Sequence, residues 1–318
     1  MENRFKNQLI FCPEYQTDLS KFGIKKNFAL DRGMKILAQL KIDLGKEIAY
    51  QKPEKISMED IYLVHDRQYV ETLKNHQTWL SIFEFKESEY FPEEAEKPLP
   101  HILEDFRIKC GGTLLASRNA LKHGLAANLG GGYHHAMPAR GQGFCAINDI
   151  AIAIRVLKKE KLIEKALIVD LDFHQGDGTA LIFQNDPEVF TLSVHSREGF
   201  PEHKQKSDLD CEITENQESV YLEKTLAALE TALGKISPDL AIFVAGSDPY
   251  EKDTLPGSKY INLSLDQMTA RDRYVIDTFA DRKIPLSLVF AGGYGPHVWE
   301  VHYHAVKHLL KRSKNGLI

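Results

Sequence analysis

Four short apolar runs in the second half of the chain alternate with longer amphipathic segments. The runs are rich in Val, Ile, Leu and Phe, which is typical of buried strands. They cover residues 166–172, 189–194, 240–246 and 286–293. Amphipathic stretches of helical length precede the first run and separate later ones, at 151–160, 221–234 and 267–282. We predict that these stretches are helices, capped at their starts by Asn148–Asp149 and Asp266 and stopped at Gly234 in the second case.

The order of these elements predicts the fold. Strand, helix and strand in succession imply right-handed crossovers and a mostly parallel sheet. Because the apolar runs are continuous, helices must cover both faces of that sheet. We therefore predict an α/β fold with a doubly wound sheet, in which residues 1–318 form a single domain. The functional site of such a sheet lies beyond the carboxyl ends of its strands. Polar residues stand there in this sequence: Asp170, Asp172, His174, His195, Ser247, Asp248 and Tyr294.

Composition narrows the class of protein. The 318 residues are 43% hydrophobic, as in ordinary globular proteins, and the net charge is -5 with a pI of about 6.2. Without a basic face, direct binding to nucleic acid is not expected. No apolar run approaches the roughly 20 residues that span a bilayer, and the N-terminus lacks the apolar core of a signal peptide.

The cysteines and one acidic segment add two expectations. The cysteines are widely separated, without a CxxC pair, which argues against a disulfide framework and a cysteine zinc site. We therefore expect a reducing, cytoplasmic setting. Residues 84–97 contain six Glu and two Lys. They are interpreted as a solvated surface loop, and the alternative is an acidic rim that attracts cationic substrates.

The segment Asp170–His174 alternates polar and apolar residues. In an extended strand, positions two apart point to the same side, so Asp172 and His174 can face one metal ion while Asp170 lies deeper. Asp248, at a neighbouring strand end, offers a third ligand, which suits a catalytic zinc site. The alternative is a polar strand end at which Asp172 caps the next helix. Burying three ionisable groups on one face without a positive partner would be costly, which disfavours that alternative.

Adjacent histidines, His134 and His135, follow three glycines at 130–132. Asp170 and Asp177 are candidate partners, and a carboxylate neighbour raises the pKa of a histidine. Such a histidine can take a proton from water and return it to an amine. The glycines would let the backbone pass close to the metal pocket. The alternatives are an incidental pair in a loop and a phosphate loop, but the Lys-Ser/Thr ending of the latter is missing.

Three aromatic residues stand next to glycines. Tyr294 lies in a Gly-rich turn after the last apolar run, where its hydroxyl could donate to a developing oxyanion. The alternative is a tyrosine that packs on the surface. Phe144 and Phe200 follow Gly143 and Gly199, and are interpreted either as walls of a narrow tunnel or as core residues.

Four segments resemble, in this order, the motifs of the histone deacetylase family: GGGYHHAMPARGQGFCAINDIAIA, DLDFHQGDG, AGSDP and AGGYG. The resemblance runs from about residue 8 to the C-terminus. Downstream, SDLDCEITENQESVYLEKTLAALE through AGSDPYEKDTLPG is most similar to the class IV, histone deacetylase 11-like branch and its bacterial homologues. The resemblance implies an arginase-like α/β fold, one catalytic zinc, a structural potassium ion and hydrolysis of acyl-lysine or acylated polyamines.

The resemblance also implies a role for each matching residue. Zinc would be held by Asp172, His174 and Asp248. A set of this kind could also hold Fe²⁺, because ligand type alone does not separate first-row metals. The matching potassium positions are the side chains of Asp170 and Ser193 and the carbonyls of Asp172, His174 and Val194.

The catalytic roles implied by the resemblance fall on five residues. His135 would be the general base, oriented by Asp177, while His134 pairs with Asp170 and Tyr294 polarises the acyl carbonyl. The acyl-lysine tunnel and the basic residue below the pocket match Gly143, Phe144, Phe200 and Arg32.

The sequence departs from the family pattern at three places. Gln175 follows the ligand where many members have histidine, Lys26–Asn27 replace a His-Pro pair, and residues 202–210 replace a Gly-rich segment. Two other classes remain open. A binuclear ureohydrolase would need a second carboxylate beside Asp248, and a non-catalytic acyl-lysine-binding protein would be expected to lack a ligand, the base or Tyr294. We expect acylated lysine in peptides or proteins, or an acylated small amine, as substrate, with an acyl chain longer than acetyl preferred.

Overall fold

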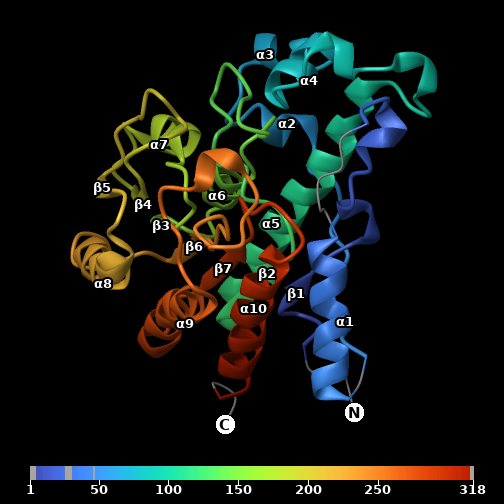
Figure 1. The fold of residues 1–318 in the computed structure, drawn as a ribbon. Coiled ribbons are helices and arrows are strands. Elements are labelled where there is room, and N and C mark those ends of the chain that lie inside the picture. Colours follow the sequence, from blue (N-terminus) through green and yellow to red (C-terminus); the bar gives the residue numbers. More distant parts are fainter. Residues whose placement is uncertain (1–4, 26–30, 46, 316–318) are drawn as a thin grey trace.

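The computed structural model describes residues 5–25, 31–45 and 47–315. Its centre is a seven-stranded sheet in which every pair of neighbouring strands is parallel (Figure 1). The strand order is β1-β2-β7-β6-β3-β4-β5. The strands are β1 (Leu9–Ile10), β2 (Leu125–Asn128), β3 (Ala166–Asp170), β4 (Val189–Ser196), β5 (Leu209–Ile213), β6 (Leu240–Val244) and β7 (Leu286–Val289).

The helices connect and cover these strands. The long ones are α1 (Arg32–Leu44), α5 (Leu103–His123), α6 (Asp149–Lys159), α8 (Glu218–Leu233), α9 (Leu265–Arg282) and α10 (Val298–Asn315). The short ones are α2 (Met58–Ile61), α3 (Arg67–Thr72), α4 (His76–Ile82) and α7 (Asp177–Phe183). No described helix combines the length and the apolar character that crossing a membrane requires.

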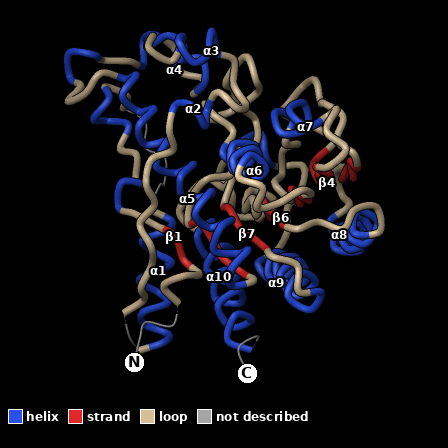
Figure 2. The backbone as a smooth tube through the Cα atoms, turned by 180° about the vertical axis from the view of Figure 1, so that it is seen from behind, coloured by secondary structure: helices blue, strands red, loops and turns tan. Residues whose placement is uncertain are grey.

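Alternate residues of the strands enter two separate cores. Leu167 and Val169 of β3 pack into a cluster with side chains of α1, α8, α9 and α10, which lie in a row in Figure 1. Ala166 and Ile168 pack into a second cluster with side chains of α5, α6 and α7. Figure 2 shows the molecule from behind, with α6 in front of the strands. Helices therefore cover both faces, which confirms the predicted doubly wound fold.

The predicted helix boundaries are right at two places and wrong at one. Asn148 caps α6 by accepting a hydrogen bond from Ala151 N at 2.9 Å, and Gly234 follows the last residue of α8. The N-cap of α9 is Ser264 rather than Asp266. Ser264 forms a capping box with Gln267, which satisfies the first N–H groups and leaves Asp266 inside the first turn.

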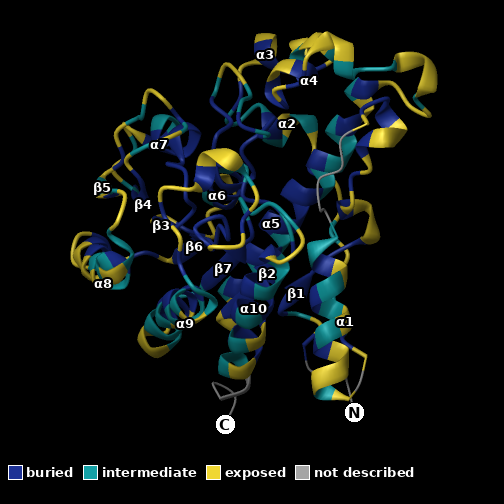
Figure 3. Cartoon of the chain, viewed as in Figure 1, coloured by how far each residue is buried: buried dark blue, intermediate teal, exposed yellow. Residues whose placement is uncertain are grey.

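The acidic segment 84–97 lies at the periphery, in the part of the chain that also carries α3 and α4 (Figure 3). It contains two 3-10 turns, Glu87–Glu89 and Pro92–Glu94, and its Glu94 pairs with Lys25 at 2.8 Å. None of its residues lines the main cavity described below. Five of its six glutamates are exposed, which agrees with the interpretation as a solvated surface segment.

Candidate active site

The strand ends bring polar residues from three parts of the sequence to one edge of the sheet. Asp172 and His174 follow β3, Asp248 follows β6, and Tyr294 follows β7. The adjacent strands β3 and β6 are in parallel register, with Asp170 opposite Val244, so their ends lie together. His195 stands at the end of β4, as predicted, but it is fully buried, its Nδ1 is hydrogen-bonded to the Ser193 hydroxyl at 2.9 Å, and it is not among the residues that line the main cavity.

Asp172, His174 and Asp248 form a candidate metal site. One ligand atom from each lies within 4.8 Å of the others, and all three residues are buried. His174 Nδ1 is 3.2 Å from Asp172 Oδ1 and 2.9 Å from Asp248 Oδ2. These are the residues that the sequence singled out as ligands, and the fold places them together.

Two features of the cluster fit a bound cation. Asp248 Oδ2 is buried, and its contact with His174 Nδ1 at 2.9 Å does not have hydrogen-bond geometry. Burial together with the charge of Asp172 raises the pKa of Asp248 to about 7. Gly292 packs so closely that an added Cβ would lie 2.4 Å from Asp248 Oδ2 and 2.5 Å from Asp172 Oδ2. Two carboxylates and one imidazole in such a confined space suit zinc with open coordination positions.

Each histidine of the adjacent pair is bonded to its own carboxylate. His134 Nδ1 lies 2.8 Å from Asp170 Oδ2, and His135 Nδ1 lies 2.7 Å from Asp177 Oδ1. The ring centroids of the two histidines are 4.0 Å apart. The glycines before them line the cavity, as expected.

The environment moves the pKa values of the two histidines in opposite directions. Burial alone would lower the pKa of His134, but the charges of Asp170 and Asp172 outweigh it and raise the pKa to about 9. At His135, burial and the charge of His134 outweigh the hydrogen bond to Asp177 and lower the pKa to about 4. The expected rise in pKa therefore occurs at His134. It is wrong for His135, because burial and the charge of His134 outweigh the effect of Asp177. A neutral His135 is in the form that accepts a proton.

Aromatic rings flank this site. The rings of Phe144 and Tyr294 are 5.8 Å apart between centroids, and the ring of Phe200 stands edge-on to His135 at 4.9 Å. Gly143, Phe144 and Tyr294 line the cavity, whereas Phe200 lies just outside its lining. Burial raises the pKa of Tyr294 well above its usual value of 10.0, so the phenol keeps its proton and can donate it in a hydrogen bond.

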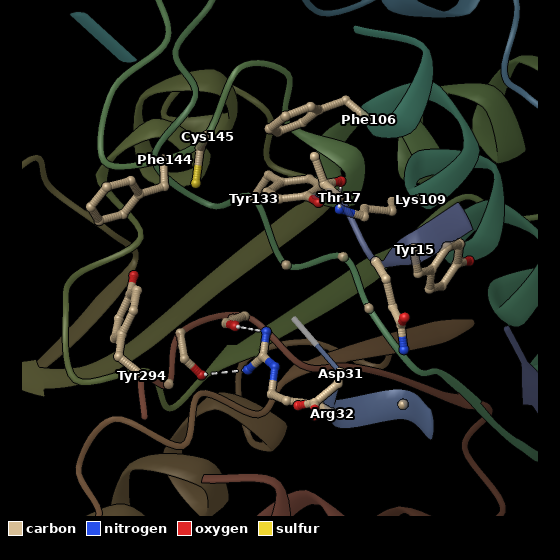
Figure 4. Close-up of a pocket in the computed structure, with 18 of the residues that line it drawn as sticks. Tyr15, Thr17, Asp31, Arg32, Phe106, Lys109, Tyr133, Phe144, Cys145 and Tyr294 are labelled. Carbon is tan, nitrogen blue, oxygen red and sulfur yellow. Dashed lines mark hydrogen bonds between the residues drawn. The ribbon is translucent and has the colours of Figure 1, made fainter. Parts of the chain in front are cut away.

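The cavity has a volume of about 1100 Å³ and extends well past the metal cluster. Arg32 lies in its wall, where the guanidinium donates to the carbonyls of Ala291 at 3.1 Å and Gly292 at 3.2 Å. Figure 4 shows Phe144 and Tyr294 at one side, Arg32 between, and Lys109 and Tyr15 at the other. Arg32 therefore borders the cavity without closing it. The Lys26–Asn27 pair lies outside the described residues.

Two of the residues matched to potassium lie opposite each other on adjacent strands. Asp170 and Ser193 are register partners of β3 and β4, and Asp170 Oδ1 accepts a hydrogen bond from Asp172 N at 3.1 Å. Gln175, the departure after His174, donates to Gln205 O at 2.6 Å and to Asp210 Oδ1 at 2.8 Å. It therefore ties the metal-ligand loop to the segment that replaces the Gly-rich stretch.

Sequence analysis missed several residues that hold the site. Asp149 accepts hydrogen bonds from Gly132 N at 2.9 Å and Tyr133 N at 2.7 Å, and so fixes the loop before His134. The buried Arg271 donates to the carbonyls of Leu171 at 2.8 Å and Gly246 at 2.9 Å, beside the metal ligands. These contacts join residues far apart in sequence, so only the fold reveals them. The polar Asp149 in an otherwise apolar helix start was the one available signal.

A buried Asp/Asp/His cluster next to two carboxylate-paired histidines, at the carboxyl edge of a parallel sheet, is an arrangement that suits a metal-dependent hydrolase. The chain belongs to the histone deacetylase family: the model of the histone deacetylase domain matches residues 27–310. This membership and the parallel sheet confirm the resemblance to the family and the deacetylase-type hydrolase expected from the sequence, whereas the class IV branch stays a prediction.

Three curated proteins illustrate the relationship. An uncharacterized protein of Picosynechococcus is 43% identical over 205 residues, which cover 64% of this chain and 67% of that protein. Histone deacetylase 2 of Arabidopsis thaliana is 31% identical over 320 residues, covering 98% and 80%. The acetoin utilization protein AcuC of Staphylococcus aureus is 31% identical over 275 residues, covering 81% and 69%.

A solved structure shares the fold. The HD domain of HDA15 superimposes with a TM-score of 0.70 at 19% sequence identity, and the match covers 98% of this chain and 92% of that one. At this level of identity the match concerns the fold alone, which is the deacetylase-type α/β architecture predicted from the sequence.

Proposed function

We propose that this protein is a zinc-dependent deacylase that hydrolyses the side-chain amide of acylated lysine. The observation that carries the proposal is the juxtaposition of the buried Asp172–His174–Asp248 cluster with His135 and Tyr294 at one cavity. Zinc held by that cluster would supply Lewis-acid polarisation and activate water. Asp170 and Ser193 would contribute to the structural potassium site that the resemblance implies.

The residues of the chain supply the remaining chemistry. Because Asp177 engages His135 Nδ1, the free Nε2 accepts the proton of the attacking water and returns it to the leaving amine. The neutral phenol of Tyr294 donates a hydrogen bond to the oxyanion that develops on the carbonyl. His134, kept charged by Asp170, adds positive charge nearby. Phe144 and Phe200 flank the lysine stem.

The size of the cavity supports an acyl group longer than acetyl. The lining of the cavity includes apolar side chains that could contact an acyl chain: Phe11, Leu19, Phe83, Ile102, Phe106 and Leu129. Each methylene buried there contributes about 0.8 kcal/mol. We therefore propose that catalytic efficiency rises with chain length until the chain fills this space.

The test compares zinc-loaded enzyme on one peptide carrying acetyl-, octanoyl- or myristoyl-lysine, and on acetylpolyamines. The proposal expects higher kcat/KM for acyl-lysine than for acetylpolyamines, and higher kcat/KM for a longer chain than for acetyl. Turnover of acetylpolyamines alone would identify a small-amine deacetylase instead. A steady fall with chain length would refute the chain-length proposal, and absence of turnover on every substrate would refute the deacylase itself.

A further inference from the structure

Lys109 is a buried cation at the far side of the active-site cavity. It lies on α5, is only 7% exposed, and lines the cavity together with Arg32 and Tyr15 (Figure 4). Its Nζ donates one hydrogen bond, to the Thr17 hydroxyl at 2.8 Å. No carboxylate of the described residues lies within 4.0 Å of Nζ. An ammonium group has three donors, so Lys109 can donate further hydrogen bonds into the cavity.

The acidic residues that line the same cavity are already engaged. Asp18 accepts hydrogen bonds from the backbone and hydroxyl of Ser20, and Asp31 pairs with Lys35 at 3.1 Å. Asp172 belongs to the candidate metal cluster. Within the described lining, Lys109 and Arg32 are thus cations that face the cavity without an ion-pair partner.

The positive charges of Lys109 and Arg32 both face the same cavity. Burial lowers the pKa of Lys109 to about 8, Asp105 opposes this shift, and the positive charge of Arg32 adds to it. A buried charge is stable when it is paired and hydrogen-bonded. An anion in this part of the cavity would accept hydrogen bonds from the remaining N–H groups of Lys109. It would also reduce the repulsion between the charges of Lys109 and Arg32.

We propose that Lys109 and Thr17 form a carboxylate-binding subsite at the far end of the active-site cavity. The proposal rests on the deacylase function, because the acyl group is the part of the substrate that enters this space. The carboxylate has two possible sources. One is the free end of a dicarboxylic acyl group on lysine, such as succinyl, glutaryl or adipoyl. The other is the monocarboxylate released by hydrolysis.

The first arm of the test compares acyl groups of equal carbon number that end in methyl or carboxylate. The pairs are butanoyl and succinyl, pentanoyl and glutaryl, and hexanoyl and adipoyl, on one lysine peptide. A charge-assisted hydrogen bond favours the carboxylate-ended substrate by about tenfold or more in kcat/KM at the length that reaches Lys109. Lys109→Met should abolish that preference, whereas Lys109→Arg, which keeps the charge, should retain part of it.

The second arm measures inhibition by butanoate and by glutarate in the same variants. If Lys109→Met weakens inhibition by butanoate about tenfold while substrate preferences do not change, the subsite takes the product carboxylate. Lys122→Met is the matched control, because Lys122 lies on α5 but is exposed and outside the cavity. Thermal unfolding of each variant verifies that it is folded.

The outcomes separate this inference from the proposed function. If the wild type hydrolyses acyl-lysine but Lys109→Met changes neither the paired-substrate ratio nor the inhibition constants, the subsite is refuted and the deacylase stands. If no amide is hydrolysed, the shift in unfolding temperature caused by glutarate still tests the subsite. A shift that is present in the wild type and lost in Lys109→Met supports it, and equal shifts in both proteins overturn it.

Discussion

His135 Nδ1 and Asp177 Oδ1 are 2.7 Å apart, and this hydrogen bond determines which nitrogen of His135 is available to substrate. The other oxygen of Asp177 accepts a hydrogen bond from Gln142 Nε2 at 2.5 Å. Asp177 begins α7, whereas Gln142 lies in the loop before α6. The carboxylate is thus held from two sides, and it fixes the orientation of the imidazole.

Removing the base should therefore lower kcat. His135→Ala is expected to reduce kcat by roughly 10² or more, as for other general bases. Asp177→Asn should also reduce kcat, because an amide can stabilise the wrong tautomer. Both variants should retain zinc. Asp266→Asn, on the exposed first turn of α9, is the control. Steady-state kinetics measure kcat for each variant. A near-normal kcat in His135→Ala would refute the role of His135 as the general base.

Tyr294→Phe removes one hydroxyl and leaves the ring beside Phe144. Loss of an oxyanion donor typically costs about 10² to 10³ in kcat. We expect a loss of that order with unchanged zinc content, since Tyr294 is not a ligand. Tyr260→Phe, at a tyrosine with 37% exposure, should behave as wild type. Equal kcat values in Tyr294→Phe and wild type would show that the carbonyl is polarised by other groups.

Gly292→Ala tests the metal cluster without removing a ligand. The new Cβ would lie 2.4 Å from Asp248 Oδ2 and 2.5 Å from Asp172 Oδ2, so the carboxylates must move apart. We expect a marked loss of zinc, measured by elemental analysis of dialysed protein. Gly257→Ala is the matched control, because its Cβ would meet nothing within 4 Å. Full zinc occupancy in Gly292→Ala would contradict the placement of the ion.

His65 should make stability depend on pH. Its Nδ1 donates to Met137 O and its Nε2 accepts from Asn148 N, both at 2.9 Å, so the buried ring is neutral. Burial lowers the pKa of His65 from 6.5 to about 4. Its contribution is therefore complete above pH 6.5 and is lost as pH falls towards 4, by about 3 kcal/mol in all.

His65→Gln removes this titration, and its free energy of unfolding should consequently fall less between pH 7 and pH 4.5 than that of the wild type. Urea unfolding at the two pH values measures the difference. Parallel losses in the two proteins would show that His65 is not the group responsible.

The sequence predicted the parts of the fold that are locally encoded. β3, β4, β6 and β7 are apolar runs, and α6, α8 and α9 are amphipathic. β1 has two residues, β2 is Ala-rich and β5 carries acidic residues, so no local pattern marked them. Their pairing depends on the rest of the sheet.

Much of the candidate site could also be predicted from the sequence. Parallel strands end at one edge, so Asp172, Asp248 and Tyr294 could be brought together by topology alone. Lys109 and His65 could not be predicted because they lie before the first motif, which begins at Gly130, on helix and loop segments without a motif. Their partners, Thr17, Met137 and Asn148, are known only from tertiary contacts.

The central claim is that hydrolysis depends on a zinc ion held by Asp172, His174 and Asp248. Zinc content and acyl-lysine turnover are therefore measured on the same preparations of wild type and Asp172→Ala, before and after chelation and after zinc is restored. We predict about one zinc per chain in the wild type, turnover that disappears on chelation and returns with zinc, and neither zinc nor turnover in Asp172→Ala. Turnover that persists in the metal-free wild type, or a full zinc complement in Asp172→Ala, would contradict the account.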